Sequence, residues 1–140
     1  MKIFLSLFSI ILLLMPSVTS FSQEKYPEAV KVLNDTIGFQ EKFLKVLTEE
    51  KKAEDVVKAL GTFADELVSL QPKIKELDSR YPDMKDPEKL PGEIKKLIAR
   101  IEELNKRLKR ETGRVLEKYS KEPAVRKAFE DFRLKVYPRP

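Results

Sequence analysis

The segment AEDVVKALGTFADELVSLQPKIKELDSRY, residues 53–81, decides the fold. Its apolar residues recur at alternating spacings of three and four over about four heptads, which places them along one side of an α-helix that faces a partner helix. Pro72 lies inside this stripe without shifting its register, so we expect one kinked helix rather than two. Leu67, at the middle of the stripe, is expected to be its most enclosed residue. The stripe consists of Ala53, Val56, Leu60, Phe63, Leu67, Leu70, Ile74, Leu77 and Tyr81.

The preceding segment carries a second helical stripe. Pro27 suits the first turn of a helix, and the apolar residues that follow it predict about six turns. One position of this stripe is polar, because Gln40 stands there. Thr48, followed by two acidic residues, is interpreted as a helix cap with charges that favour the helix dipole.

From residue 81 onward the sequence predicts a loop and then two further helices. Residues 81–91 contain three prolines and predict a loop, and a third amphipathic helix follows over about residues 92–119. A short amphipathic helix follows Pro123, and no segment alternates with the period of two that is typical of a strand. We therefore predict an all-α fold: an elongated antiparallel bundle of three long helices and a short C-terminal helix.

The first 22 residues have the pattern of an export signal. Lys2 is followed by the apolar run Ile3–Met15, which is interrupted only by two serines, and small residues follow the run. Cleavage after Ser20 or after Ser22 fits the pattern. The alternative is an uncleaved anchor, but a helix of this length spans only ~20 Å of a hydrocarbon core of ~30 Å. We expect an exported protein, periplasmic or secreted and soluble after cleavage.

On this reading the chain divides into the signal peptide, residues 1–22, and one helical bundle domain, residues 23–140. The composition then excludes most site chemistry. The chain has no Cys and no His, which excludes disulfides and thiolate metal sites and removes the commonest catalytic base. Neighbouring carboxylates on a helix point about 100° apart, so the acidic pairs do not converge on one point. We expect no catalytic, cofactor-binding or metal-binding residue, and a protein that is not an enzyme.

Charge is unevenly distributed along the chain. Residues 23–90 hold 12 Lys and Arg against 15 Asp and Glu, whereas residues 91–140 hold 15 against 8, a net charge of +7. The densest basic cluster lies on the predicted third helix, where it could contact anionic lipid headgroups or surface polymers, or form an ordinary solvated face. No nucleic-acid-binding motif accompanies it, so we expect no nucleic-acid partner. The cluster consists of Lys106, Arg107, Lys109, Arg110 and Arg114.

Two aromatic residues stand out on the short C-terminal helix. Phe129 and Phe132 lie between charged residues. They could cap the bundle, or they could remain exposed as an apolar contact patch.

The layout of a signal peptide, no cysteine, long charged helices and a proline-containing middle loop resembles small exported helical-bundle proteins of bacteria that have no assigned function. A weaker resemblance is to periplasmic helical chaperones of the Spy and CpxP type, which carry an L-T-x-x-Q motif. Residues 47–51, LTEEK, have its Leu and Thr, and residues 67–71, LVSLQ, have its Leu and Gln. The resemblance implies a protein without enzymatic activity that contacts other polypeptides.

These observations predict a non-enzymatic interaction or chaperone-like scaffold in the periplasm. We expect a protein partner or self-association. The alternative is a binding module that uses the basic third helix on an anionic membrane surface or a surface polymer.

Overall fold

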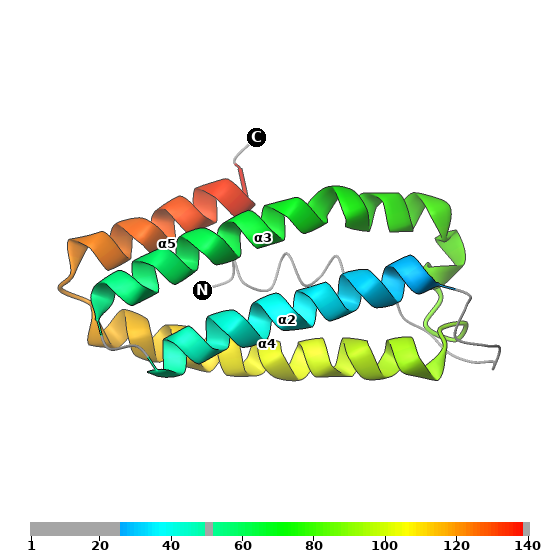
Figure 1. The fold of residues 1–140 in the computed structure, drawn as a ribbon, viewed down its shortest axis with the longest axis horizontal. Coiled ribbons are helices and arrows are strands. Elements are labelled where there is room, and N and C mark those ends of the chain that lie inside the picture. Colours follow the sequence, from blue (N-terminus) through cyan, green and yellow to red (C-terminus); the bar gives the residue numbers. More distant parts are fainter. Residues whose placement is uncertain (1–25, 50–51, 139–140) are drawn as a thin grey trace.

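The computed structural model describes residues 26–49 and 52–138. The predicted export signal and both of its cleavage sites lie outside these residues. No strand occurs in the described ranges, so the prediction of an all-α fold is confirmed. The elements are α2 (Pro27–Glu49), α3 (Ala53–Arg80), the short 3-10 helix η1 (Pro82–Lys85), α4 (Gly92–Lys118) and α5 (Pro123–Val136) (Figure 1).

Helices α2 and α3 form the centre of the molecule. They lie side by side and run in opposite directions, and α4 packs along the other side of α2 (Figure 1). Helix α5 packs against α3. Lys135 of α5 forms an ion pair with Asp65 of α3. The four helices therefore produce an elongated shape in which α2 and α3 are each covered by one outer helix.

Helix α3 is continuous through Pro72, as the register of its apolar stripe predicts. The expectation that Leu67 is the most enclosed residue of the stripe is wrong. Its side chain is 7% exposed, whereas Val56 is fully buried. The most enclosed residues of the stripe lie nearer the N-terminus of α3, where Val56, Leu60 and Phe63 are at most 1% exposed. One turn beyond Leu67, Gln71 donates from Nε2 to the carbonyl of Val136, the last residue of α5.

The core consists of two clusters of buried side chains, one towards each end of the bundle. We call the cluster near the C-terminus of α2 and the N-terminus of α3 the four-helix end, because all four α-helices contribute to it. We call the cluster near η1 the three-helix end, where α3 contributes only partly buried residues. The four-helix end includes Phe43, Leu47, Leu60, Phe63, Leu108, Val125 and Phe132. The three-helix end includes Tyr26, Leu33, Met84, Ile94, Ile98 and Ile101.

The polar position in the stripe of α2 has a partner in α4. Gln40 is fully buried, and its Nε2 donates to Oδ1 of Asn105 at 2.6 Å. A buried polar contact of this kind favours one register of two helices over the alternatives, since a shifted register leaves the amide without a partner. The contact therefore fixes α2 against α4.

Thr48 does not begin a helix. It lies in the last turn of α2, where its Oγ1 donates to the carbonyl of Leu44 at 3.0 Å. Helix α3 is capped instead by Lys52, the residue before its first turn, whose backbone N–H donates to Oδ2 of Asp55 at 3.0 Å. The cap predicted at Thr48 is therefore wrong, because the apolar stripe of α2 continues through Leu47 and holds this turn in the helix.

Candidate functional site

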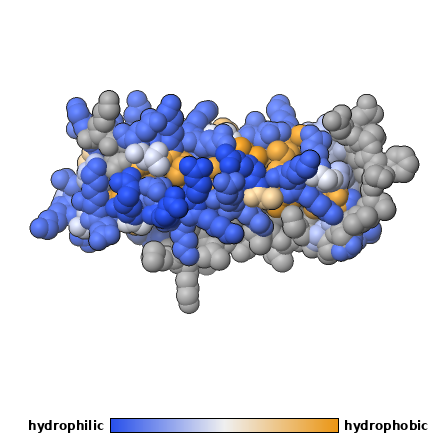
Figure 2. Space-filling view, turned by 90° about the horizontal axis from the view of Figure 1, so that it is seen from below, coloured by the Kyte–Doolittle hydropathy of each residue, from blue (hydrophilic) through white to orange (hydrophobic). Residues whose placement is uncertain are grey.

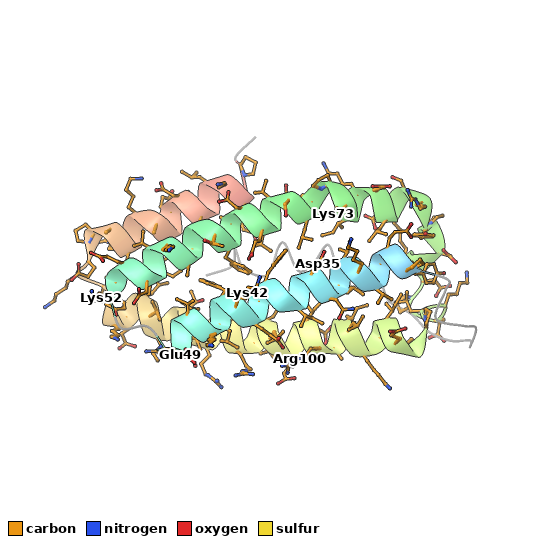
Figure 3. The ribbon with its side chains drawn as sticks, viewed as in Figure 1. Asp35, Lys42, Glu49, Lys52, Lys73 and Arg100 are labelled. Carbon is orange, nitrogen blue, oxygen red and sulfur yellow. The ribbon has the colours of Figure 1, made fainter. Side chains whose placement is uncertain are left out.

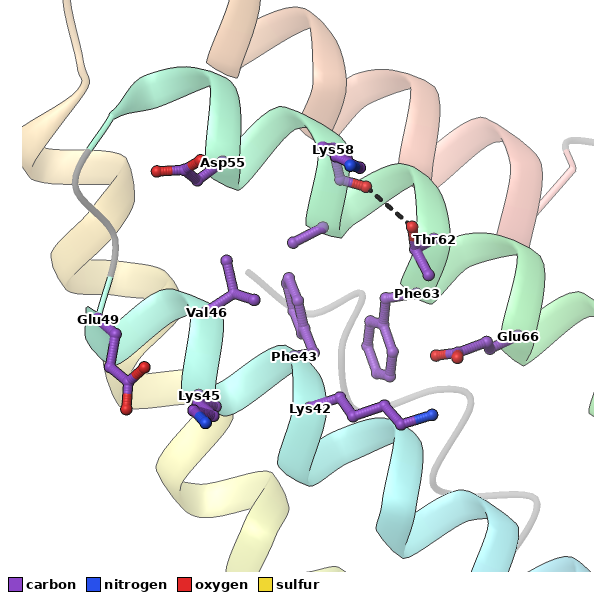
Figure 4. Close-up of a pocket in the computed structure, with 11 residues that line it drawn as sticks. Lys42, Phe43, Lys45, Val46, Glu49, Asp55, Lys58, Thr62, Phe63 and Glu66 are labelled. Atoms are coloured by element: carbon purple, nitrogen blue, oxygen red, sulfur yellow. Dashed lines mark hydrogen bonds between the residues drawn. The ribbon is translucent and has the colours of Figure 1, made fainter.

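A groove lies between the C-terminal half of α2 and the N-terminal half of α3 (Figure 4). Its volume is about 450 Å³. The floor consists of apolar side chains from both helices, and Thr62 lies at its edge, with its hydroxyl bonded to the carbonyl of Lys58. The floor residues are Phe43, Val46, Ala59 and Phe63.

The floor is held in place by stacked aromatic rings. Phe43 of α2 and Phe63 of α3 stack with ring centroids 4.5 Å apart, and Phe63 stacks on Phe132 of α5 at 5.9 Å. Phe132 is 5% exposed and is therefore a core residue. The alternative in which Phe132 remains exposed as a contact is wrong, because this ring closes the stack. Phe129 is half-buried against the same cluster.

The rim of the groove carries lysines and carboxylates from both helices. Figure 4 shows the side chain of Lys42 extending towards Glu66 across the groove. Burial raises the pKa of Glu66, and the nearby Lys42 ammonium opposes that rise. Lys42 also lies over the ring of Phe39, with Nζ 5.7 Å from its centroid. The remaining charged residues of the rim are Lys45, Glu49, Asp55 and Lys58.

A smaller cavity of about 160 Å³ continues along the same two helices at the three-helix end. Glu28 and Asp35 line the smaller cavity, and Lys42 and Glu49 line the groove. Residues seven positions apart lie on the same side of a helix, so both cavities open on one side of the helix pair. We call this side the α2/α3 face. The charged residues of the smaller cavity are Glu28, Lys31, Asp35, Lys73, Glu76 and Arg80.

The predicted basic cluster of α4 lies away from the groove. Within the described residues, two of its members form ion pairs and three do not. Arg110 and Arg114 both bind the carboxylate of Glu111, and Arg114 also donates to the carbonyl of Leu47 at the end of α2. Hydrogen bonding to Arg114 contributes most to lowering the pKa of Glu111. Arg114 therefore has a structural role that its position in the sequence did not indicate.

The other three members of the cluster are Lys106, Arg107 and Lys109, and they form no ion pair within the part of the chain that the structure describes. Lys106 and Lys109 are exposed, whereas Arg107 is half-buried. Viewed from the side of α4, much of the surface is hydrophilic, with apolar residues visible between the charged ones (Figure 2). The exposed lysines of this surface, Lys106 and Lys109, are its exposed unpaired positive charges among the described members of the cluster.

Among the described residues, no group of three or more acidic side chains is placed to hold a metal ion. In the same residues no helix is both long and apolar enough to cross a membrane. Comparison of the chain with protein-family models, with curated proteins and with solved structures found no match. The site is therefore defined by its geometry: a groove in an all-α protein with an apolar floor and charged walls.

Sequence reasoning did not find the groove. Its floor residues belong to the apolar stripes, which predict burial but not the width of the gap between two helices. The available signal is the set of charges that recurs every seven residues beside each stripe, at Glu28, Asp35 and Lys42 in α2 and at Glu66, Lys73 and Arg80 in α3. Charges beside an apolar seam mark the positions that flank a helix–helix contact.

Proposed function

We propose that this protein is an exported, non-enzymatic scaffold that acts by binding amphipathic segments of other polypeptides, as an interaction or chaperone-like protein in the periplasm. The unit that acts is the antiparallel bundle of three long helices and one short helix, of which the α2/α3 pair supplies the binding surface. The observation that carries the proposal is the groove of about 450 Å³ over the Phe43–Phe63 stack.

The chemistry of the groove fits an amphipathic helix. Its apolar floor can accept the apolar side of such a helix, while the lysines and carboxylates of the rim can pair with charges along its edges. The rim is balanced in sign, with three basic and three acidic residues. This balance favours a partner of mixed charge over a strongly acidic or strongly basic one.

The experiment uses protein expressed from the full sequence in a bacterial host and purified from the periplasmic fraction. Its intact mass reports whether the chain is exported and cleaved after Ser20 or Ser22. Light scattering then follows the aggregation of thermally unfolding citrate synthase with and without the protein. We expect suppression of aggregation, and we expect Thr62→Arg to reduce it, because an arginine at this exposed position fills the mouth of the groove.

Ala99→Arg is the matched control, since it adds the same side chain at an exposed position of α4. Equal suppression by both variants would place the activity outside the groove. A chain that stays in the cytoplasm with its first 22 residues uncleaved would contradict the exported role.

The second candidate is binding of an anionic surface through α4. It is favoured by one observation, the exposed Lys106 and Lys109, which have no ion pair in the described residues. Each exposed basic residue near an anionic membrane contributes ~1 kcal/mol and is screened by salt. Binding to vesicles that contain phosphatidylglycerol should therefore weaken with salt and with reversal of Lys106, Lys109 and Arg110 to Glu. Unchanged binding by the reversed variant would remove this candidate.

A further inference from the structure

The charges of the α2/α3 face follow a register that the structure fixes. Arg80 Nη1 lies 2.8 Å from Glu28 Oε1, so positions 28 and 80 share one level of the antiparallel helix pair. The helices are antiparallel, so the next levels are found by adding seven in α2 and subtracting seven in α3. These levels pair Asp35 with Lys73 and Lys42 with Glu66. Figure 3 shows Asp35 and Lys73 at the same level of the two helices, and Figure 4 shows the same for Lys42 and Glu66. At every one of these levels the two helices carry opposite charges.

Two of these three levels remain open within the molecule. Glu28 and Arg80 are in contact, but Asp35, Lys73, Lys42 and Glu66 form no ion pair within residues 26–49 and 52–138. The groove and the smaller cavity separate the two rows of charges. Each row is therefore available to a surface that approaches the face from outside.

The face is also the neutral side of a basic protein. The charged residues that line its two cavities comprise six basic and six acidic side chains, whereas residues 91–140 carry a net charge of +7. Two copies of the chain repel one another through the helices that belong to the second range. They can approach through the α2/α3 face without that repulsion.

We propose that the α2/α3 face binds the same face of a second copy of this chain, and so forms a symmetric dimer. The proposal rests on the interaction function above and names the partner of that surface. A twofold axis parallel to the two helices places α2 of one copy over α3 of the other. Rotation about this axis does not move a residue along the helices, so residues that share a level in one copy meet across the interface. Lys42 then faces Glu66 of the partner subunit, and Asp35 faces Lys73 of the partner subunit. All four of these charges then meet the opposite sign, and the apolar floors of the two grooves face each other across the axis.

The experiment measures self-association by sedimentation velocity over a range of concentrations, with the protein purified after expression from its full sequence. We expect a reversible monomer–dimer equilibrium for the unchanged chain. Lys42→Glu and Glu66→Lys should each weaken dimerisation by roughly tenfold, because the twofold symmetry places like charges together at two positions. Lys109→Glu makes the same charge change on α4 and should leave the equilibrium unchanged.

The decisive step mixes the two single variants, one of them labelled with nitrogen-15, and measures dimer masses by native mass spectrometry. In a mixed dimer the new carboxylate at position 42 faces the new lysine at position 66, and the remaining pair is native. We therefore expect the mixed dimer to form in preference to either homodimer. A purely intramolecular role for these charges predicts no such preference.

Three results overturn the proposal: an unchanged chain that sediments as a monomer at all concentrations, a dimer that Lys42→Glu does not weaken, or a mixture without mixed dimers. Failure of the proposed function has a different signature. A monomer that suppresses citrate synthase aggregation retains the function and loses the dimer. A mixed dimer without any effect on aggregation retains the dimer and loses the chaperone-like activity.

Discussion

At the four-helix end of the bundle three stacked phenylalanine rings close the core, whereas at the three-helix end two tyrosine rings meet edge to face and their hydroxyl groups bind carboxylates. Phe43, Phe63 and Phe132 form one stack through α2, α3 and α5. At the opposite end the hydroxyl of Tyr26 donates to Asp83 Oδ2 at 2.6 Å, and the hydroxyl of Tyr81 donates to Glu28 Oε2 at 2.6 Å.

The difference follows from the number of helices available at each end. Helix α5 covers α3 only at the four-helix end, so there the fourth helix supplies apolar area and excludes water. At the three-helix end the short η1 and the loop after it replace a helix, and a short segment has less apolar surface to contribute. Polar contacts of Tyr26, just before α2, and of Glu28, in its first turn, complete the enclosure. Stability at the four-helix end should therefore depend on the volume of the buried side chains. Stability at the three-helix end should depend on the protonation of its carboxylates.

The largest effect is expected from Phe63→Ala at the four-helix end. Phe63 is 1% exposed and contacts both other rings of the stack, so its removal leaves a cavity that costs ~3–5 kcal/mol of unfolding free energy. Urea denaturation followed by circular dichroism measures this change. Leu134→Ala is the control, because this side chain is 43% exposed and should change stability by less than ~0.5 kcal/mol. Equal effects of the two substitutions would show that the stack is not part of the core.

A smaller effect is expected from Tyr26→Phe at the three-helix end. This change keeps the buried ring and removes its hydrogen bond to a carboxylate, which costs ~1–3 kcal/mol. Tyr119→Phe makes the same change at the four-helix end, where the Tyr119 hydroxyl has no hydrogen bond within the described residues, and should cost less than ~0.5 kcal/mol. The same urea titration compares the two variants. If Tyr119→Phe destabilises the protein as much as Tyr26→Phe, the contrast between the two ends is wrong.

How far the sequence predicts the fold can be judged from α3. Spacings of three and four predict the helix and its buried side, and the unchanged register predicts that it continues through Pro72, because both are properties of one helix. Gln40 was visible as a polar interruption. Its partner Asn105 could not be predicted, because the two residues are 65 positions apart in sequence and their contact depends on how α2 and α4 are aligned.

The candidate site was less predictable than the fold. The basic cluster around Arg114 was evident as a run of charge, yet the contact of Arg114 with the carbonyl of Leu47 depends on where α2 ends against α4. The groove depends on the separation of α2 and α3, which no single helical pattern encodes. Periodicity assigns the side of a helix that is buried, whereas the distance between two helices follows from all the side chains between them.

The smallest effect, and the one that separates the two ends most directly, is expected from pH. The hydroxyl of Tyr81 and the guanidinium of Arg80 both bind the carboxylate of Glu28 and hold its pKa below the ordinary value, with the Tyr81 contact contributing most. The folded state thus binds this proton more weakly than the unfolded state does. The contact stabilises the fold at neutral pH, and this stabilisation is lost as the pH falls below about 4.3 and through the lowered pKa of Glu28.

Hydrogen exchange of the backbone amides measures this loss at each end separately. Between about pH 5 and pH 3, protection at the first turn of α2 and at η1 should fall more steeply than protection around the Phe43–Phe63 stack, once the intrinsic pH dependence of exchange is removed. Glu28→Gln should reduce the additional slope, since its amide does not titrate. The hydrogen bond from Tyr81 to Glu28 also raises the pKa of Tyr81, so the stabilisation is present below the ordinary tyrosine pKa of about 10 and is lost above it, through the raised value. Equal slopes at the two ends would mean that the contacts of Glu28 with Tyr81 and Arg80 do not hold the three-helix end closed.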